Sequence, residues 1–96
     1  MTLNIRRLVL DVDKAATRPT LVELAAAIDK VEGVEALNIT VTEIDLETIG
    51  TEITIAGTDI HYDALVKAIE ASGAVVHSVD QLAAGERLIE RTRPDG

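Results

Sequence analysis

The sequence contains no cysteine, no tryptophan and no phenylalanine, and its single aromatic residue is Tyr62. Without cysteine the chain has no disulfide framework, no thiol nucleophile and no cysteine-based zinc site. Without aromatic rings it lacks the stacking platforms typical of proteins that bind single-stranded nucleic acid. We therefore expect a core of leucine, isoleucine, valine and alanine, and no nucleic acid partner.

Positive charge is scarce as well. Nine Lys and Arg residues stand against 17 Asp and Glu residues, which gives a net charge of −8. This charge repels phosphate groups and strengthens the argument against nucleic acid. Only Lys14, Lys30 and Lys67 are lysines. Few lysines among many acidic residues are typical of halophilic proteins, in which acidity serves solubility.

Long apolar segments are also missing. The sequence has no uninterrupted apolar run of the roughly 18 residues that a membrane-spanning helix needs, and residues 1–7 lack the apolar core of a signal peptide. We therefore expect a cytoplasmic protein with no membrane partner. Its 96 residues fit the size of one domain, so we predict a single domain over residues 1–96.

The segment Ile5–Asp13 is the strongest strand signal. Leu8, Val9 and Leu10 are apolar at successive positions, and a strand with this pattern points apolar side chains to both faces of its sheet. The pattern predicts a central strand. It ends in Asp11 and Asp13, which share one face because strand side chains repeat every second residue.

Two segments have helical periodicity. Thr20 and Glu23 have the spacing of a capping box, and apolar residues at helical spacing follow until Gly33, which we expect to end the first helix. The second helix is expected over Ile60–Ser72, with Gly73 closing it.

The remaining elements are strands. Leu37–Leu46 and Glu52–Ala56 alternate between apolar and polar residues and form a predicted hairpin, and Val75–Val79 is the fourth strand, followed by a tail from about residue 82. The order strand, helix, strand, strand, helix, strand predicts an α+β, ferredoxin-like split βαβ fold (βαββαβ). Its four-stranded antiparallel sheet carries both helices on one face.

One face of such a sheet has no helix. We assign nine apolar residues to the helix-covered face: Ile5, Val9, Leu37, Ile39, Val41, Ile53, Ile55, Val75 and Val79. The open face is then expected to carry Leu8, Leu10, Val12, Ile44 and Leu46. Burying five such side chains is worth roughly 7–15 kcal/mol. We therefore expect another subunit to cover them, with the C-terminal tail as the alternative cover.

Acidic residues are expected to meet at one edge of the sheet, where the first two strands end and the last two begin. Asp11, Asp13 and Asp45, with His77 near them, are candidate ligands for a divalent cation. Carboxylate oxygens suit Ca²⁺ or Mg²⁺, and the histidine would suit a transition metal. The alternative is a solvated acidic rim. No cofactor is otherwise indicated.

The sequence offers little support for an enzyme. It has no nucleophile with an adjacent base and no glycine-rich phosphate loop. His61 stands at the start of the second helix, where we expect it to cap the backbone.

Three stretches point to a family: Ile5–Val12, Leu37–Val41 with Glu43–Asp45, and Val76–Asp80 with Ala84–Gly85. Through them the chain resembles the small archaeal family catalogued as domain of unknown function 211. The resemblance implies a ferredoxin-like fold, closed homo-oligomers and no established activity. An archaeal source would also suit the halophilic composition.

Two functions remain open. The first is a non-enzymatic homo-oligomer, a ring or a filament, that binds a divalent cation at the acidic edge. The second is a regulatory module of the ACT kind, which binds a small molecule between subunits.

Overall fold

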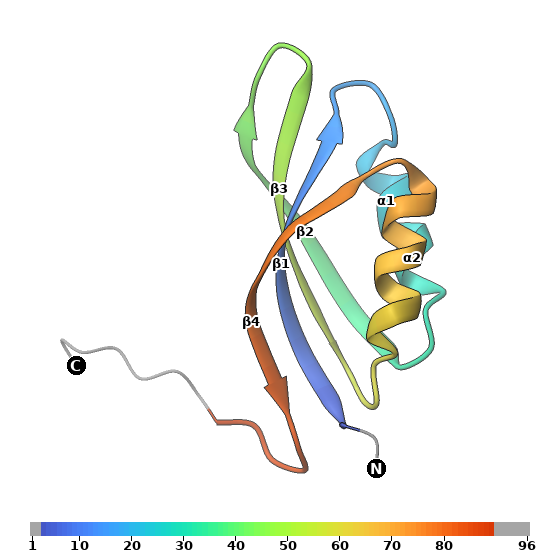
Figure 1. The fold of residues 1–96 in the computed structure, drawn as a ribbon, viewed down its shortest axis with the longest axis vertical. Helices are drawn as coiled ribbons and strands as arrows, with labels where there is room; N and C mark the ends of the chain where they lie inside the picture. The colour runs from blue at the N-terminus through green and yellow to red at the C-terminus, as the bar shows by residue number, and fades with distance from the viewer. Residues whose placement is uncertain (1–2, 90–96) are drawn as a thin grey trace, which may run out of the picture.

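The computed structural model describes residues 3–89, which form one sheet and two helices (Figure 1). The elements in chain order are β1 (Ile5–Ala15), α1 (Leu21–Asp29), β2 (Val34–Ile44), β3 (Thr48–Gly57), α2 (Tyr62–Ser72) and β4 (Val75–Ala84).

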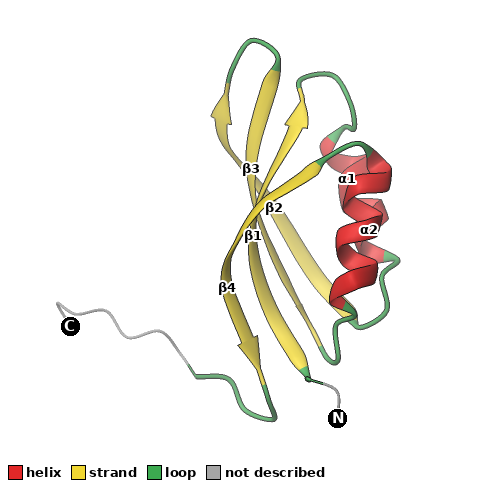
Figure 2. Cartoon of the chain, viewed as in Figure 1, coloured by secondary structure: helices red, strands yellow, loops and turns green. Residues whose placement is uncertain are grey.

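The sheet has the strand order β2-β3-β1-β4, and every neighbouring pair is antiparallel. Both helices lie on the same side of it, and residues 3–89 place no second layer on the other face (Figure 2). The structure therefore confirms the ferredoxin-like βαββαβ fold and the central position of β1.

Helix α1 begins with the expected capping box. The Glu23 backbone N–H donates to Thr20 Oγ1 at 3.1 Å, and the Thr20 N–H donates to Glu23 Oε1 at 2.9 Å. The helix ends at Asp29 with Lys30 as its C-cap, earlier than Gly33. Gly33 instead has a φ of +95° in the following loop, where a Cβ would lie 2.5 Å from the Asp59 carbonyl oxygen.

Helix α2 ends at Ser72 as predicted, but it begins at Tyr62, two residues later than expected. His61 is its N-cap, and the Ala64 N–H donates to His61 Nδ1 at 3.3 Å. Gly73 is its C-cap with a φ of +107°, a left-handed conformation that glycine adopts without steric penalty. The capping role expected for His61 is confirmed.

The assignment of β1 side chains to the two faces was wrong. Leu8, Leu10 and Val12 are fully buried in the core with residues of both helices. They lie opposite Ile55, Ile53 and Thr51 of β3, which face the helices too. These three residues were predicted as a subunit interface on the open face, and their burial within the subunit rules that role out.

Irregularities in strand pairing explain the error. Ile5 lies opposite Ala84 but Arg7 lies opposite Ala83, so Arg6 is an extra residue in β1. Such a bulge shifts the alternation by one position. Ile5 and Leu8 consequently face the same side although their numbers differ by three.

A similar shift affects β4, in which His77 and Asp80 are extra residues relative to β1. Val76 packs against the core, whereas Val75 lies opposite Asp13 and points to the open face. Val9 of β1 also faces this side, opposite Thr54. Val9 and Val75 had been assigned to the helix-covered face.

Most residues of the open face are consequently small or polar. Its residues, from register, include Ala36, Asn38, Thr40, Thr54, Ala56, Arg7, Val9, Asp11, Asp13, Ser78, Gln81 and Ala83. An antiparallel sheet with one solvated polar face needs no second layer. The expectation of a cover rested on five large apolar residues, and the structure places Leu8, Leu10 and Val12 in the core instead.

Strand β4 is longer than expected and continues to Ala84. Leu82, predicted to begin the tail, pairs with Leu8 instead. The part of the predicted tail after residue 89 lies outside the described residues.

Candidate functional site

The β2–β3 hairpin, residues 41–49, extends beyond the ends of both helices (Figure 1). Its turn is fixed by two short hydrogen bonds. The Asp45 N–H donates to the Thr48 carbonyl at 2.8 Å, and the Leu46 N–H donates to Asp45 Oδ1 at 2.8 Å. The turn is therefore a defined projection from the sheet.

This hairpin carries the most exposed apolar residues of the sheet. Ile44 is 76% exposed and Leu46 at the tip is 90% exposed. Ile44 pairs with Ile49, on the side of the sheet that the helices would cover if they reached so far. The other two predicted interface residues are thus accessible, but at the hairpin and not on the open face.

Carboxylates surround these apolar side chains. Glu43, Asp45 and Glu47 alternate with Ile44 and Leu46, and residues 41–49 contain no Lys or Arg. None of the three carboxylates forms an ion pair within residues 3–89. The hairpin therefore presents an apolar tip in a locally negative setting.

The predicted acidic edge is partly formed, on the open face next to this hairpin. Asp13 Oδ2 lies 4.0 Å from His77 Nδ1, and both side chains are substantially exposed. A Cβ on Gly50 would lie 3.6 Å from Asp13 Oδ1 and 3.5 Å from Glu43 Cβ. Asp13, His77 and Glu43 thus occupy the same part of the sheet.

The four predicted ligands do not converge, however. Asp45 uses its carboxylate to close the hairpin turn, and Asp11 pairs across the sheet with Glu52 and Ser78. Across the described chain, no three His, Cys, Asp or Glu side chains are arranged to hold a metal ion. Of the four predicted ligands, the structure therefore brings together Asp13 and His77, whereas Asp45 is held in the hairpin turn.

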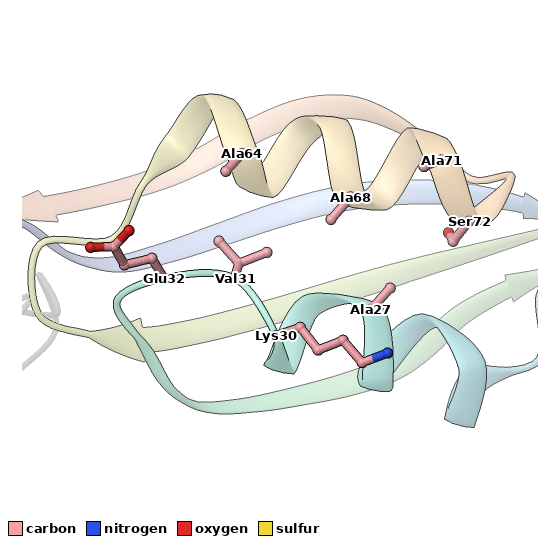
Figure 3. A pocket seen from close by; sticks show the side chains of 8 residues that line it. All are labelled: Ala27, Lys30, Val31, Glu32, Ala64, Ala68, Ala71 and Ser72. Atoms are coloured by element: carbon pink, nitrogen blue, oxygen red, sulfur yellow. The ribbon is translucent and has the colours of Figure 1, made fainter.

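A groove of about 500 Å³ lies between the two helices (Figure 3). It is lined by Ala27, Lys30, Val31, Glu32, Ala64, Ala68, Ala71 and Ser72. Most of these side chains are small, so the two helices leave a depression in the outer surface of the helix layer. The sequence shows the alanines, but only the packing of α1 against α2 brings them together.

One lysine lines this groove and a second lies beside it on α2. Lys30 lines it, and Lys67 lies on α2 at helical spacing from Ala64 and Ala71. Neither lysine has a carboxylate partner in the described part of the chain. Glu32 lines the groove too, toward Ala64, whereas the Lys30 amine lies near Ala27 (Figure 3).

The third lysine, Lys14, was not singled out from the sequence. It is 95% buried, since only 5% of its surface is exposed, and its Nζ donates to the Ala15 carbonyl at 2.9 Å. It continues the inward-facing positions Leu10 and Val12. The alternation Leu10, Val12, Lys14 was the signal in the sequence that could have predicted the burial of Lys14. Lys14 lies where the helix-covered part of the sheet meets the hairpin.

Neither helix within residues 3–89 combines the length and apolar character that crossing a membrane demands.

Comparison with known proteins places the chain in a family. The profile of domain of unknown function 211 (DUF211), described as "Uncharacterized ArCR", matches residues 6–95. The "Uncharacterized protein MJ0319" of Methanocaldococcus jannaschii is 37% identical over 90 residues, which cover 94% of this chain and 92% of that relative. Neither description names an activity. The resemblance seen in the sequence is confirmed, and the chain belongs to the archaeal DUF211 family.

Proposed function

We propose that this protein is a non-enzymatic subunit of a homo-oligomer and that the β2–β3 hairpin takes part in the subunit contact. The observation that carries the proposal is the exposure of Ile44 and Leu46 on a hairpin with a well-defined turn. Burying each of these side chains would contribute about 1.5–3 kcal/mol. Exposed apolar side chains that cluster in this way usually mark a site of association.

The non-enzymatic part of the proposal is supported by how the polar side chains are used. Ser72 Oγ donates to the Ile69 carbonyl and Ser78 Oγ donates to Asp80. His61 caps α2 through Nδ1. Within residues 3–89 no serine hydroxyl is hydrogen-bonded to a histidine, which is the usual way to activate such a nucleophile.

A more specific form of the proposal is that the oligomer binds a divalent cation. Asp13 and His77 supply two ligands on the open face, and a cation there would need further oxygen ligands from a second subunit or from solvent. Cation binding would then depend on assembly. Loss of bound metal from the Asp13→Asn variant, with the oligomer retained, is the expected result by native mass spectrometry.

The alternative is an ACT-like module, in which a small molecule binds between subunits. This function shares the fold and the oligomer with the first proposal and differs only in the bound species. Copurification of a small organic molecule with the oligomer, and its absence from the monomer, would favour it over the cation.

The experiment for assembly is a mass measurement of the full chain by light scattering at low and at high salt. We expect a discrete multiple of the subunit mass, and we expect Leu46→Asp to lower it. Val22→Asp is the matched control, because Val22 is 78% exposed on α1 and belongs neither to the hairpin nor to the groove between the helices. A wild-type protein that is monomeric under all conditions would contradict the proposal.

A further inference from the structure

We propose that the groove between α1 and α2 receives the hairpin tip of a second copy of this chain, with Leu46 as the inserted side chain. The inference rests on the proposed function, because it specifies how the subunits of the homo-oligomer meet. It identifies a receiving surface on the helix layer, where the sequence had suggested contacts through the sheet.

Size and chemistry fit this occupant. The groove has a volume of about 500 Å³, and its walls include Ala27, Val31 and Ala68. Alanines leave the helix backbones accessible and provide apolar contact without obstruction. The occupant must carry a large apolar side chain on a narrow projection. Leu46, 90% exposed at a three-residue turn, has both properties.

The charges of the two surfaces are complementary as well. Asp45 and Glu47 flank Leu46 and have no basic partner within residues 3–89. Lys30 lines the groove, Lys67 lies on α2 at helical spacing from the lining residues Ala64 and Ala71, and neither lysine has an acidic partner in the same range. Docking would bring these opposite charges together, which favours one register of the hairpin and disfavours other partners.

Glu32 is the one carboxylate that lines the groove, and it restricts the orientation of the hairpin. It lies toward Ala64, away from the Lys30 amine near Ala27 (Figure 3). An acidic hairpin is repelled at the Glu32 end and attracted at the Lys30 end. We therefore place Leu46 between Ala27 and Ala71.

The contact joins two different surfaces. The hairpin tip of a subunit projects past the ends of its own helices (Figure 1), whereas the groove lies between those helices (Figure 3). Each subunit therefore has one inserting and one receiving surface. Repetition of such a contact from subunit to subunit gives a closed ring or an open filament, and reciprocal insertion by two subunits gives a symmetric dimer.

The test uses one variant for each surface. Leu46→Asp disables the inserting surface, and Ala71→Glu places a carboxylate in the receiving groove. Both positions are exposed, so both variants should fold, which far-UV circular dichroism can verify. The matched control is Ala26→Glu, an exposed α1 position outside the groove.

We expect each variant alone to raise the apparent Kd for assembly about 30-fold, as loss of one buried leucine contact implies, and the control to leave it unchanged. Mixed together, the two variants should form a 1:1 dimer. That dimer retains one intact contact, between the hairpin of the Ala71→Glu subunit and the groove of the Leu46→Asp subunit.

Three results would overturn the inference. A wild-type oligomer unaffected by Ala71→Glu would exclude the groove while leaving homo-oligomerisation in place. Dissociation by both variants without a 1:1 dimer on mixing would exclude the heterologous contact. A monomeric wild-type protein would remove the proposed function itself, and this inference with it.

Discussion

The helix-covered part of the sheet and the β2–β3 hairpin beyond it are made of similar residues in opposite environments. Leu10 and Val12 are fully buried beneath α1 and α2, whereas Ile44 and Leu46 are mostly exposed. The difference lies in coverage, because the helices end before the hairpin does (Figure 1). Hydrophobic residues in the first region stabilise the subunit, and those in the second are available to a neighbour.

The boundary between the two regions is where polar groups become buried. Thr51 is fully buried and donates from Oγ1 to the Val12 carbonyl at 2.7 Å. Lys14, one step nearer the hairpin, is also buried. Buried polar groups need partners, and here the partners are backbone carbonyls of β1.

The largest expected effect is a loss of stability from a mutation in the helix-covered sheet that the matched mutation in the hairpin does not cause. Leu10→Ala removes a fully buried side chain and should lower the free energy of unfolding by about 2–5 kcal/mol, since a cavity is left in the core. Leu46→Ala, the matched change in the hairpin, should alter it by no more than about 0.5 kcal/mol for the unassembled subunit. Urea denaturation at low protein concentration measures both.

A smaller effect should appear at the boundary. Thr51→Val keeps the shape of the side chain but loses the hydrogen bond to Val12, and should lower the free energy of unfolding by about 1 kcal/mol. Thr48→Val, at an exposed position where β3 begins, is the control. Equal effects at the two positions would show that the boundary bond does not contribute.

The order of elements was predictable because each has local signals. The capping box at Thr20, the glycine after α2 and the alternation in β3 act within a few residues, and the structure retains them. In β2 the alternation is interrupted at Thr42, where the pairing with β3 shifts by one residue. The predicted end of α1 at Gly33 was wrong, because the helix ends at Asp29. Gly33 resembles a C-cap, but its conformation serves the close approach of the chain near Asp59.

The faces of the sheet could not be assigned in the same way. A bulge such as the one at Arg6 shifts every later residue of the strand, and nothing in the alternation marks it. The segment Arg7–Asp13 taken alone gives the right answer, because its polar residues share one face and Leu8, Leu10 and Val12 share the other. If the alternation is instead counted from Ile5, across the bulge at Arg6, Leu8, Leu10 and Val12 are assigned to the wrong face.

The sequence predicted which site residues lie close together only where the pairing of strand ends brings them together. Asp13 and His77 are brought together by the pairing of β1 with β4. Asp45 is not, because its carboxylate is needed by the turn. The groove between α1 and α2 depends on helix packing, which no local pattern in the sequence encodes.

The smallest expected effect concerns the pH dependence of the helix layer. The pKa of the Glu23 carboxyl is lowered from its usual 4.5, mainly by the hydrogen bond from the Thr20 backbone N–H. The positive charge of Arg18, whose Nη2 lies 3.2 Å from Glu23 Oε2, lowers this pKa further. A carboxyl with a lowered folded-state pKa stabilises the fold above its unfolded-state pKa and loses that contribution as pH falls through the folded-state value.

Glu23→Gln should therefore be less stable than wild type at neutral pH, and the difference should shrink below about pH 4.5. Urea midpoints measured across this range give the difference directly. Arg18→Ala is the informative companion, because it removes the weaker cause and keeps the Thr20 hydrogen bond, so most of the pH dependence should remain. A difference between Glu23→Gln and wild type that stayed constant with pH would mean that the charge of Glu23 does not contribute to the stability of the helix layer.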